Sequence, residues 1–336
     1  MIPAHFSGIL LDFLRSFCYN TDKTMKNGTQ EECDMAENTL KKIDVHVHTV
    51  MYPEITLPRP DGGTCASVEQ LKAMYDAWGI ERGMILPAVA NEGNYGMTTN
   101  EEAYMICREH PDRFYWACDL TPRMGENGMG TDFSRIVNHY KSLGAKAVGE
   151  LGYNLPFDDP VSEKLLCACA EADLPVDIHI ADRIGNTYGV YDELHLPRIE
   201  KMLKAHPNLR IFGHSQCFWA EISGDVTEET RGIYPPGKVR EGTLHRLLRT
   251  YPNLYCDLSA GSGSNAFLRD EEHGLRFIEE FEDRLLYGTD ICSPKNTFAI
   301  GKWLDDRHAS GDISDRAYYK ICRGNAIREL KLELPY

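Results

Sequence analysis

Short apolar runs alternate with helical patterns from Lys42 onward, and this alternation restricts the fold more than any other feature of the chain. Eight of the runs are rich in β-branched and aromatic residues, which predicts strands. Strands and helices that alternate at a fairly regular spacing are typical of βα units around a parallel sheet. The predicted strands span residues 43–48, 83–88, 113–120, 145–151, 175–180, 209–215, 253–259 and 284–290.

Helical patterns occupy the segments between these strands. They cover residues 67–79, 100–110, 132–144, 162–174, 196–207 and 242–252, and several end at Gly or Pro, as helices commonly do. The later units repeat one order, in which Pro-Asn marks the turn into a strand (HPNLRIFGHS, then YPNLYCDLS). The sequence therefore predicts an α/β fold, a (β/α)8 TIM barrel over residues 41–336, with further helices from the C-terminal segment 296–336.

The first 40 residues differ in character from the predicted barrel. Residues 1–20 are apolar but have no basic start, and Asp12 and Arg15 interrupt the apolar run, so we do not expect a signal peptide. No run approaches the roughly 20 apolar residues that cross a bilayer. The polar stretch 21–38 resembles a linker. We expect residues 1–40 to form a short amphipathic appendage or an arm used in dimerisation.

Charge and cysteine content exclude several classes of function. The formal net charge is −15, and no Lys/Arg cluster interrupts the acidic balance, so we expect neither a nucleic-acid nor a membrane partner. Eleven cysteines are scattered along the chain without a C-x-x-C pair, which does not predict a disulfide framework. These features predict reduced thiols in a cytoplasmic protein.

The first predicted strand carries the motif H-V-H. Side chains alternate across a strand, so His46 and His48 are expected on one side, with Val45 and Val47 on the other. The two imidazoles then converge at the end of the strand. A lone histidine is more often a structural residue, but four further His or acidic residues lie near other strand ends, namely Glu150, His179, His214 and Asp290.

The C-terminal ends of all strands in such a barrel face one central bowl. Imidazole and carboxylate groups gathered there predict a divalent metal site with nitrogen and oxygen ligands. Zinc suits this histidine-rich set best, although manganese or iron would accept the same ligands, and one or two ions are possible.

These motifs resemble the amidohydrolase superfamily, in its amidohydrolase-related (amidohydrolase 2) branch of metal-dependent TIM-barrel hydrolases and decarboxylases. The similarity spans about 42–330 and rests on H-V-H, I-H-I, F-G-H-S, Y-G-T-D and the trailing G-N-A. The resemblance implies that His46, His48, His179 and Asp290 coordinate the metal. It also implies that His214 assists catalysis, or belongs to a second ion, and that Asp290 can shuttle a proton.

Glu150, in the phrase V-G-E-L-G, leaves two interpretations open. In two-metal members of the superfamily an acidic group at this strand end bridges or binds the second ion, which His179 and His214 would complete. Alternatively, the carboxylate orients a histidine or a substrate amine. A bridging lysine typical of the family is missing, since Lys146 lies too early in the strand.

Residues for substrate recognition are less well defined. Arg59, Arg183 and Arg123 follow predicted strands and are suited to clamp a carboxylate, although each is more often a solvated loop charge. Three further side chains are candidates for the pocket wall: Tyr153, Asn154 and Trp219. We expect the long loops 52–65 and 218–238 to form lids or pocket walls, because loops after barrel strands bind substrates.

The leading hypothesis is a metal-dependent hydrolase that uses activated water on a small amide, lactone or related carbonyl substrate. The alternative enzyme is a non-oxidative decarboxylase of a small aromatic or unsaturated carboxylic acid. Glu150 favours hydrolysis, because decarboxylases of this type generally need one metal. A non-catalytic binding protein is a third option, and a barrel of that kind should have lost a ligand. We expect a small-molecule substrate and, by base rate, a homodimer.

Overall fold

The computed structural model describes residues 40–59, 62–89, 98–126 and 129–334. Residues 41–336 form one unit. The appendage expected over residues 1–40 lies outside the described residues except for Leu40, so that boundary stays a prediction. Within the described part, no helix is long and apolar enough to span a membrane. The nine cysteines that the structure describes form no disulfide with one another.

Eight parallel strands form the centre of the structure, in two hydrogen-bonded sheets. The first sheet holds β1 (Lys42–Val47), β2 (Ile80–Ile85) and β3 (Phe114–Trp116), in that order. The second holds β4 (Val148–Leu151), β5 (Val176–Ala181), β7 (Ile211–His214), β8 (Leu254–Asp257) and β9 (Leu285–Leu286). Each strand lies within one of the eight predicted strands or overlaps it.

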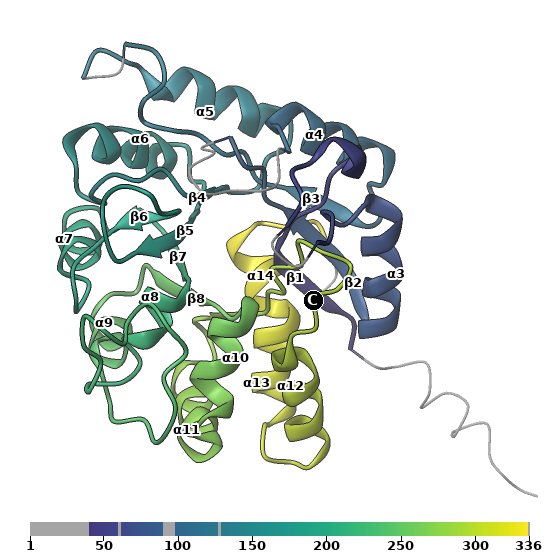
Figure 1. The fold of residues 1–336 in the computed structure, drawn as a ribbon, viewed down its shortest axis with the longest axis vertical. Coiled ribbons are helices and arrows are strands. Elements are labelled where there is room, and N and C mark those ends of the chain that lie inside the picture. Colours follow the sequence, from purple (N-terminus) through teal and green to yellow (C-terminus); the bar gives the residue numbers. More distant parts are fainter. Residues whose placement is uncertain (1–39, 60–61, 90–97, 127–128, 335–336) are drawn as a thin grey trace, which may run out of the picture. The chain divides into compact units, whose positions relative to one another are not determined.

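Backbone hydrogen bonds join the two sheets at both seams and close the barrel. Between β3 and β4, the Cys118 amide donates to the Ala147 carbonyl at 3.0 Å. Between β1 and β9, the His48 amide donates to the carbonyl of Ile291 at 2.8 Å. Figure 1 shows the resulting ring of strands inside a layer of helices. The predicted (β/α)8 fold is confirmed.

The outer layer follows the predicted helical segments and adds one helix that was not predicted, over Glu271–Phe281. It contains α3 (Val68–Trp78), α4 (Asn100–Glu109), α5 (Phe133–Ser142), α6 (Pro160–Glu171), α7 (Pro197–Ala205), α9 (Thr243–Thr250), α11 (Glu271–Phe281) and α12 (Ala299–Ala309). Local capping explains the boundaries. Ser67 and Gln70 form a capping box at the start of α3, and Gly79 ends the helix with φ at +67°.

Further elements follow several strand ends. They are η1 (Pro53–Ile55), β6 (Val190–Tyr191), α8 (Gln216–Ala220) and α10 (Ala260–Leu268). The strand β6 pairs with the end of β5 through Ile180 and Val190. It was not predicted, because two residues are too few to show a period.

The C-terminal segment closes the N-terminal end of the barrel. It comprises α13 (Asp315–Tyr319), the single turn η2 (Lys320–Gly324) and α14 (Asn325–Glu329), and Figure 1 shows α14 within the ring of strands. The Asn325 amide donates to Leu285, the first residue of β9, at 2.8 Å. One buried cluster joins this segment to the strands through Ile43, Val45, Met84, Leu86, Phe212, Leu286, Ala326, Ile327 and Leu330. The opposite end of the barrel is left for a site.

The alternation predicted for β1 holds for His46 and His48, which lie together, but the strand is irregular just before them. Val45 belongs to the interior cluster together with Ile43, although His46 and His48 also approach side chains from other strands. The pairing of β1 with β2 shifts register between Asp44 and Val47. An irregularity of this kind changes which way the following side chains point.

We expect Ile327→Ala to lower the free energy of unfolding by about 2–5 kcal/mol, because it opens a cavity in a fully packed interior. Ile327 is 2 % exposed and lies at the end of the barrel away from the strand ends that carry the histidines. Urea unfolding measures the change. Leu143→Ala is the control, since Leu143 is 36 % exposed. An Ile327→Ala effect no larger than that of the control would contradict this account of the core.

Candidate metal centre

The structure gathers all six predicted metal-site residues at the C-terminal ends of the strands. His46 lies in β1, Glu150 in β4, His179 in β5 and His214 at the end of β7, while His48 and Asp290 follow β1 and β9. Residues up to 244 positions apart in the chain, His46 and Asp290, thus face one another. The strand ends therefore bring these side chains together, and their role as metal ligands stays a prediction.

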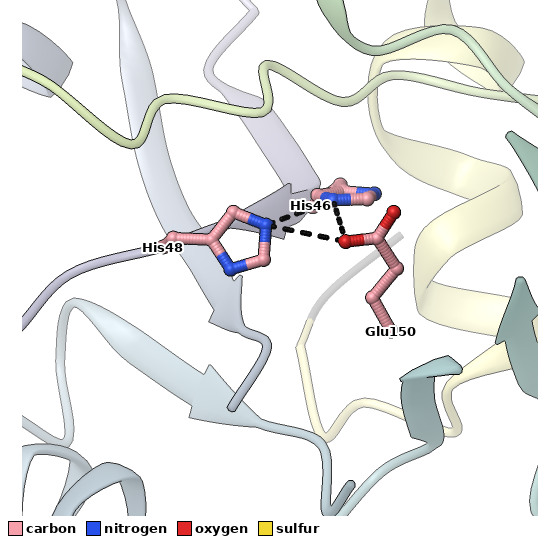
Figure 2. Close-up of side chains that lie close together, drawn as sticks. All are labelled: His46, His48 and Glu150. Atoms are coloured by element: carbon pink, nitrogen blue, oxygen red, sulfur yellow. Dashed lines mark hydrogen bonds and ion pairs between the residues drawn. The ribbon is translucent and has the colours of Figure 1, made fainter. Parts of the chain in front are cut away.

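Figure 2 shows the first of three groups, formed by His46, His48 and Glu150. The other two are Glu150–His179–His214 and His46–His214–Asp257. The Nε2 atoms of the two histidines lie 3.2 Å apart. Glu150 Oε2 lies 3.6 Å from His46 Nε2 and 3.5 Å from His48 Nε2. Three donor atoms of this kind, each within reach of one point, form a possible metal-binding group.

Glu150, His179 and His214 form a second group that shares the carboxylate with the first. The other oxygen of Glu150, Oε1, lies 2.8 Å from His179 Nδ1 and 3.9 Å from His214 Nε2. Asp290 lies between the groups, with Oδ1 3.4 Å from His48 Nε2 and Oδ2 3.8 Å from His214 Nε2. Glu150 therefore offers a different oxygen to each group.

Hydrogen bonds behind the rings leave the inward nitrogens free to act as ligands. His46 Nδ1 lies 2.6 Å from Asp257 Oδ2, and His48 Nδ1 lies 3.0 Å from the Leu86 carbonyl oxygen. Because these oxygens accept, the Nδ1 atoms carry the protons and each neutral ring keeps its lone pair on Nε2. Histidines that bind metals are usually held in this way.

The carboxylates in the centre are buried and favour positive charge. Burial is the largest influence on Glu150 and opposes its ionisation, but His46 and His179 help to outweigh it, so the pKa of Glu150 lies well below its usual value. Burial likewise opposes charge on His48, yet hydrogen bonds to Asp290 and Glu150 raise the pKa of His48 to about 9. The pKa of His46 is also raised well above its usual value, by the charges of Asp257 and other carboxylates against the effect of burial.

His214 behaves differently from the two histidines of β1. Burial disfavours its charged form and the neighbouring His46 acts in the same direction, so the pKa of His214 falls to about 4. At neutral pH this ring is an uncharged imidazole, which can accept a proton or bind a metal.

Two glycines allow the strands to approach closely enough to form the centre. Gly149 has φ at +152°, and a Cβ atom there would lie 2.6 Å from the Asp177 carbonyl oxygen. A Cβ atom at Gly288 would lie 2.3 Å from Asp257 Oδ1 and 3.2 Å from His46 Cβ. Side chains at these positions would push the strands apart or displace Asp257.

Four residues of the centre were missed by the sequence analysis: Asp177, Asp257, Ser259 and Tyr188. Asp257 Oδ2 bonds His46, and Ser259 Oγ lies 2.9 Å from His214 Nδ1. The alternation of side chains along a strand could have identified Asp177, Asp257 and Ser259. Asp177 precedes His179 by two positions, and Asp257 precedes Ser259 by two, so each pair shares one face of its predicted strand. Tyr188 donates to Glu150 Oε2 at 3.1 Å from a loop, for which no periodic signal exists.

The structure does not place two of the substrate candidates on a pocket wall. Tyr153 is fully buried beside Ser162 of α6, and burial raises the pKa of its phenol. Trp219 is 2 % exposed, stacks edge-on against Phe267 of α10 and donates to the Asp257 carbonyl at 2.9 Å. Both side chains are packed between strands and helices. The sequence alone did not determine this direction, because neither residue lies within a strand.

Asn154 and Arg183 shape a loop beside the centre. The buried Asn154 amide donates to the carbonyls of Arg183 and Gly189, both at 3.0 Å. The Arg183 side chain is 59 % exposed and pairs with Asp182 at 2.9 Å. The loop that these contacts fix carries Tyr188, so Asn154 influences the centre through the backbone.

The remaining candidate arginines, Arg123 and Arg59, lie on loops. Arg123 donates to the Asn154 carbonyl at 3.0 Å. Burial raises the pKa of the Cys292 thiol to about 12, and the charge of Arg59 opposes the rise, so Arg59 acts on a residue two positions after Asp290. Arg59 therefore remains a candidate to meet an anionic group of a substrate.

The sequence matches the family model described as Amidohydrolase over residues 43–332. The chain belongs to the amidohydrolase family. The match includes residues of every strand of the barrel and all six residues of the predicted centre. Among curated proteins, none matches this chain.

Solved structures share the fold of this amidohydrolase. An uncharacterised TIM-barrel protein from Bordetella bronchiseptica is 21 % identical, with a TM-score of 0.56, 87 % of this chain and 99 % of that chain covered. A dihydroxybenzoic acid decarboxylase from Polaromonas, solved with manganese and the inhibitor 2-nitroresorcinol, is 15 % identical, with a TM-score of 0.54, covering 88 % and 98 %. A protein from Pseudomonas putida assigned as a 2-pyrone-4,6-dicarboxylic acid hydrolase is 14 % identical, with a TM-score of 0.55, covering 89 % and 100 %.

We expect the metal-free protein to lose stability as the pH rises from 6.5 to about 9. The folded protein holds the His48 proton up to the higher value, whereas an unfolded histidine releases it near the lower one. In this window the folded state binds more protons than the unfolded state, so the free energy of unfolding falls with rising pH. His48 makes its full contribution to the free energy of unfolding only below about pH 6.5. Urea unfolding of chelator-treated protein at several pH values measures the slope.

His48→Gln should flatten this slope, while His46 keeps part of it. His308→Gln is the matched control, because His308 lies on α12 and pairs with the exposed Asp315. A slope in His48→Gln equal to that of the control would show that His48 does not hold the proton.

Proposed function

We propose that this amidohydrolase is a metal-dependent hydrolase of a small amide, lactone or related carbonyl compound. The observation that carries the proposal is the pair of metal-binding groups, His46–His48–Glu150 and Glu150–His179–His214, which share one carboxylate. Separate oxygens of Glu150 face the two groups. This arrangement suits a two-ion centre with Glu150 as the bridge, and two-ion centres are typical of hydrolytic enzymes.

The residues present fit a divalent ion. In their neutral form, which metal binding requires, the two β1 histidines have their lone pairs on Nε2. Glu150 is ionised, and the raised pKa values of His46 and His48 reflect a demand for positive charge that a metal ion would also satisfy. Nitrogen and oxygen donors of this kind suit zinc, with manganese and iron as further candidates. The manganese in the decarboxylase from Polaromonas supports the same range of ions.

A divalent ion in this centre would lower the pKa of a water molecule and polarise the carbonyl group of the substrate. His214 is neutral and has its lone pair on Nε2, so it can accept a proton or orient the water. Asp290 Oδ2 lies 3.8 Å from that nitrogen, which suits Asp290 to carry a proton to the leaving group. Arg59 and Tyr188 lie where they could meet the substrate, Arg59 from the first long loop and Tyr188 from the loop after β5.

Decarboxylation is a second candidate, and one contact favours it. Glu150 Oε1 lies 2.8 Å from His179 Nδ1, the distance of a carboxylate that orients a histidine. If Glu150 has that role alone, the centre holds a single ion. The structural likeness to a dihydroxybenzoic acid decarboxylase supports this alternative, with a small aromatic or unsaturated carboxylic acid as substrate.

A metal count separates the two candidates. We expect two ions per chain in the wild type, prepared without added chelator, and one in Glu150→Gln, because the amide is a poor bridging ligand. Glu163→Gln is the control, since Glu163 lies on α6 and pairs with His206 at 2.7 Å. One ion in all three proteins would make Glu150 an orienting residue and favour decarboxylation, and no ion in any of them would overturn both.

The reaction itself is tested with two panels of compounds. We expect the metal-loaded protein to open small lactones or cleave small amides, with the acid released followed by pH-stat. Asp290→Asn should lower the rate by at least roughly 100-fold, the usual contribution of a general acid or base. Carbon dioxide released from dihydroxybenzoates, without any lactone or amide cleavage, would replace hydrolysis with decarboxylation.

A further inference from the structure

Two side chains at the end of β8, Asp257 and Ser259, lie behind the centre and connect two of its histidines. Both residues are completely buried. Ser259 follows Asp257 by two positions, and its amide donates to Asp257 Oδ1 at 3.0 Å. The carboxylate is therefore fixed by its own backbone.

The direction of each hydrogen bond in this connection follows from the chemistry of the groups. The Ser259 hydroxyl donates to Asp257 Oδ2 at 2.7 Å. A serine hydroxyl has a single proton to donate, so toward His214 Nδ1, at 2.9 Å, Ser259 Oγ acts as the acceptor. His214 consequently carries its proton on Nδ1 and its lone pair on Nε2. The same carboxylate oxygen lies 2.6 Å from His46 Nδ1.

The helix that follows gives an independent reason to assign a special role to Ser259. Ser259 occupies the N-cap position of α10 (Ala260–Leu268), where a serine side chain normally accepts a backbone N–H of the first turn. Here its side chain makes no capping hydrogen bond. The hydroxyl bonds Asp257 and His214 instead. The helix therefore lacks the capping hydrogen bond that would stabilise its first turn.

We propose that Ser259 is the positioning residue that sets the tautomer of His214, and that Asp257 is the positioning residue shared by His214 and His46. We call this set of hydrogen bonds, formed by Ser259 and Asp257, the relay. It directs the Nε2 atoms of the neutral His46 and His214 rings toward Glu150 and Asp290. Without Ser259, the closest alternative acceptor for His214 Nδ1 is Asp257 Oδ2, at 3.5 Å. That oxygen already bonds His46 Nδ1 at 2.6 Å, whereas two carboxylates, Glu150 and Asp290, lie 3.9 and 3.8 Å from Nε2. We therefore expect the proton to shift to Nε2 when Ser259 is removed.

The relay has a consequence for metal binding, and this part rests on the proposed function. Each of the two histidines belongs to its own group with Glu150, His46 beside His48 and His214 beside His179, and the two also form a group with Asp257. Loss of Ser259 affects His214 alone, because His46 keeps its contact with Asp257. Loss of Asp257 affects both rings. Removal of Ser259 should therefore weaken one of the two groups that contain Glu150, and removal of Asp257 should weaken both.

The tautomer is tested in metal-free protein by ¹⁵N NMR of selectively labelled histidine. In the wild type we expect His214 with a protonated Nδ1 and an unprotonated Nε2. Ser259→Ala should reverse this pattern, and Ser259→Thr, which keeps the hydroxyl, should restore it. Ser262→Ala is the control, because Ser262 lies on the same helix, is 3 % exposed and donates its hydroxyl to the Ser259 backbone carbonyl at 3.5 Å. Thermal unfolding verifies that each variant is folded.

A His214 spectrum in Ser259→Ala that matches the wild type would overturn the proposal, as would an equal change in Ser262→Ala. A metal competition assay extends the test. Ser259→Ala should weaken the binding of one ion by roughly 10–100-fold, as expected when the partner of a ligand is removed, and Asp257→Ala should weaken both. If the wild type bound no ion, the proposed function would fail while the tautomer result would still decide the relay.

Discussion

The barrel closes at the seam between β1 and β9, and a buried carboxylate holds that seam. Asp44 accepts hydrogen bonds from the amide and the hydroxyl of Thr289, at 2.9 and 2.6 Å, and from the Tyr75 hydroxyl of α3 at 2.7 Å. Burial raises the pKa of Asp44 to about 6, although these bonds oppose the rise. Asp44 lies two positions before His46, and Thr289 immediately precedes Asp290. The contacts that close the barrel therefore also fix the first histidine and the last carboxylate of the centre.

Charge within the closed barrel is the second constraint. Asp177 is completely buried, its carboxyl oxygens have no hydrogen-bond partner in the described part of the chain, and burial raises its pKa well above the usual value. One of these oxygens lies 3.6 Å from His46 Nδ1, on the side where Asp257 already accepts. Behind His46 the barrel thus supplies more acidic groups than one ring can pair. Against the effect of burial, Asp257 and Asp177 thereby help to raise the pKa of His46, whereas the pKa of His48 is raised by Asp290 and Glu150 on the other side of the centre.

The sequence predicted the strands and six residues of the centre for the same physical reason. Parallel strands impose a period and a common end, so a side chain such as His179 can be placed without knowledge of any loop. Side chains just beyond a strand end lack that restriction, and Tyr153 and Trp219 accordingly turned toward the helices. Tyr188 depends on a loop that Asn154 holds through contacts with distant carbonyl groups. Contacts of that kind leave no trace in spacing or composition.

The two interpretations of Glu150 are compatible with each other in this geometry. Each carboxylate oxygen has two lone pairs. Oε1 uses one for His179 and Oε2 uses one for Tyr188, so one lone pair remains on each oxygen. Glu150 can therefore orient His179 and still offer a ligand atom to each group. The number of ions then depends on the orientation of the His179 ring and on His214, whose free nitrogen is set by Ser259. The residue that determines the free nitrogen of the second group thus lies just after β8, a strand for which the sequence predicted no ligand.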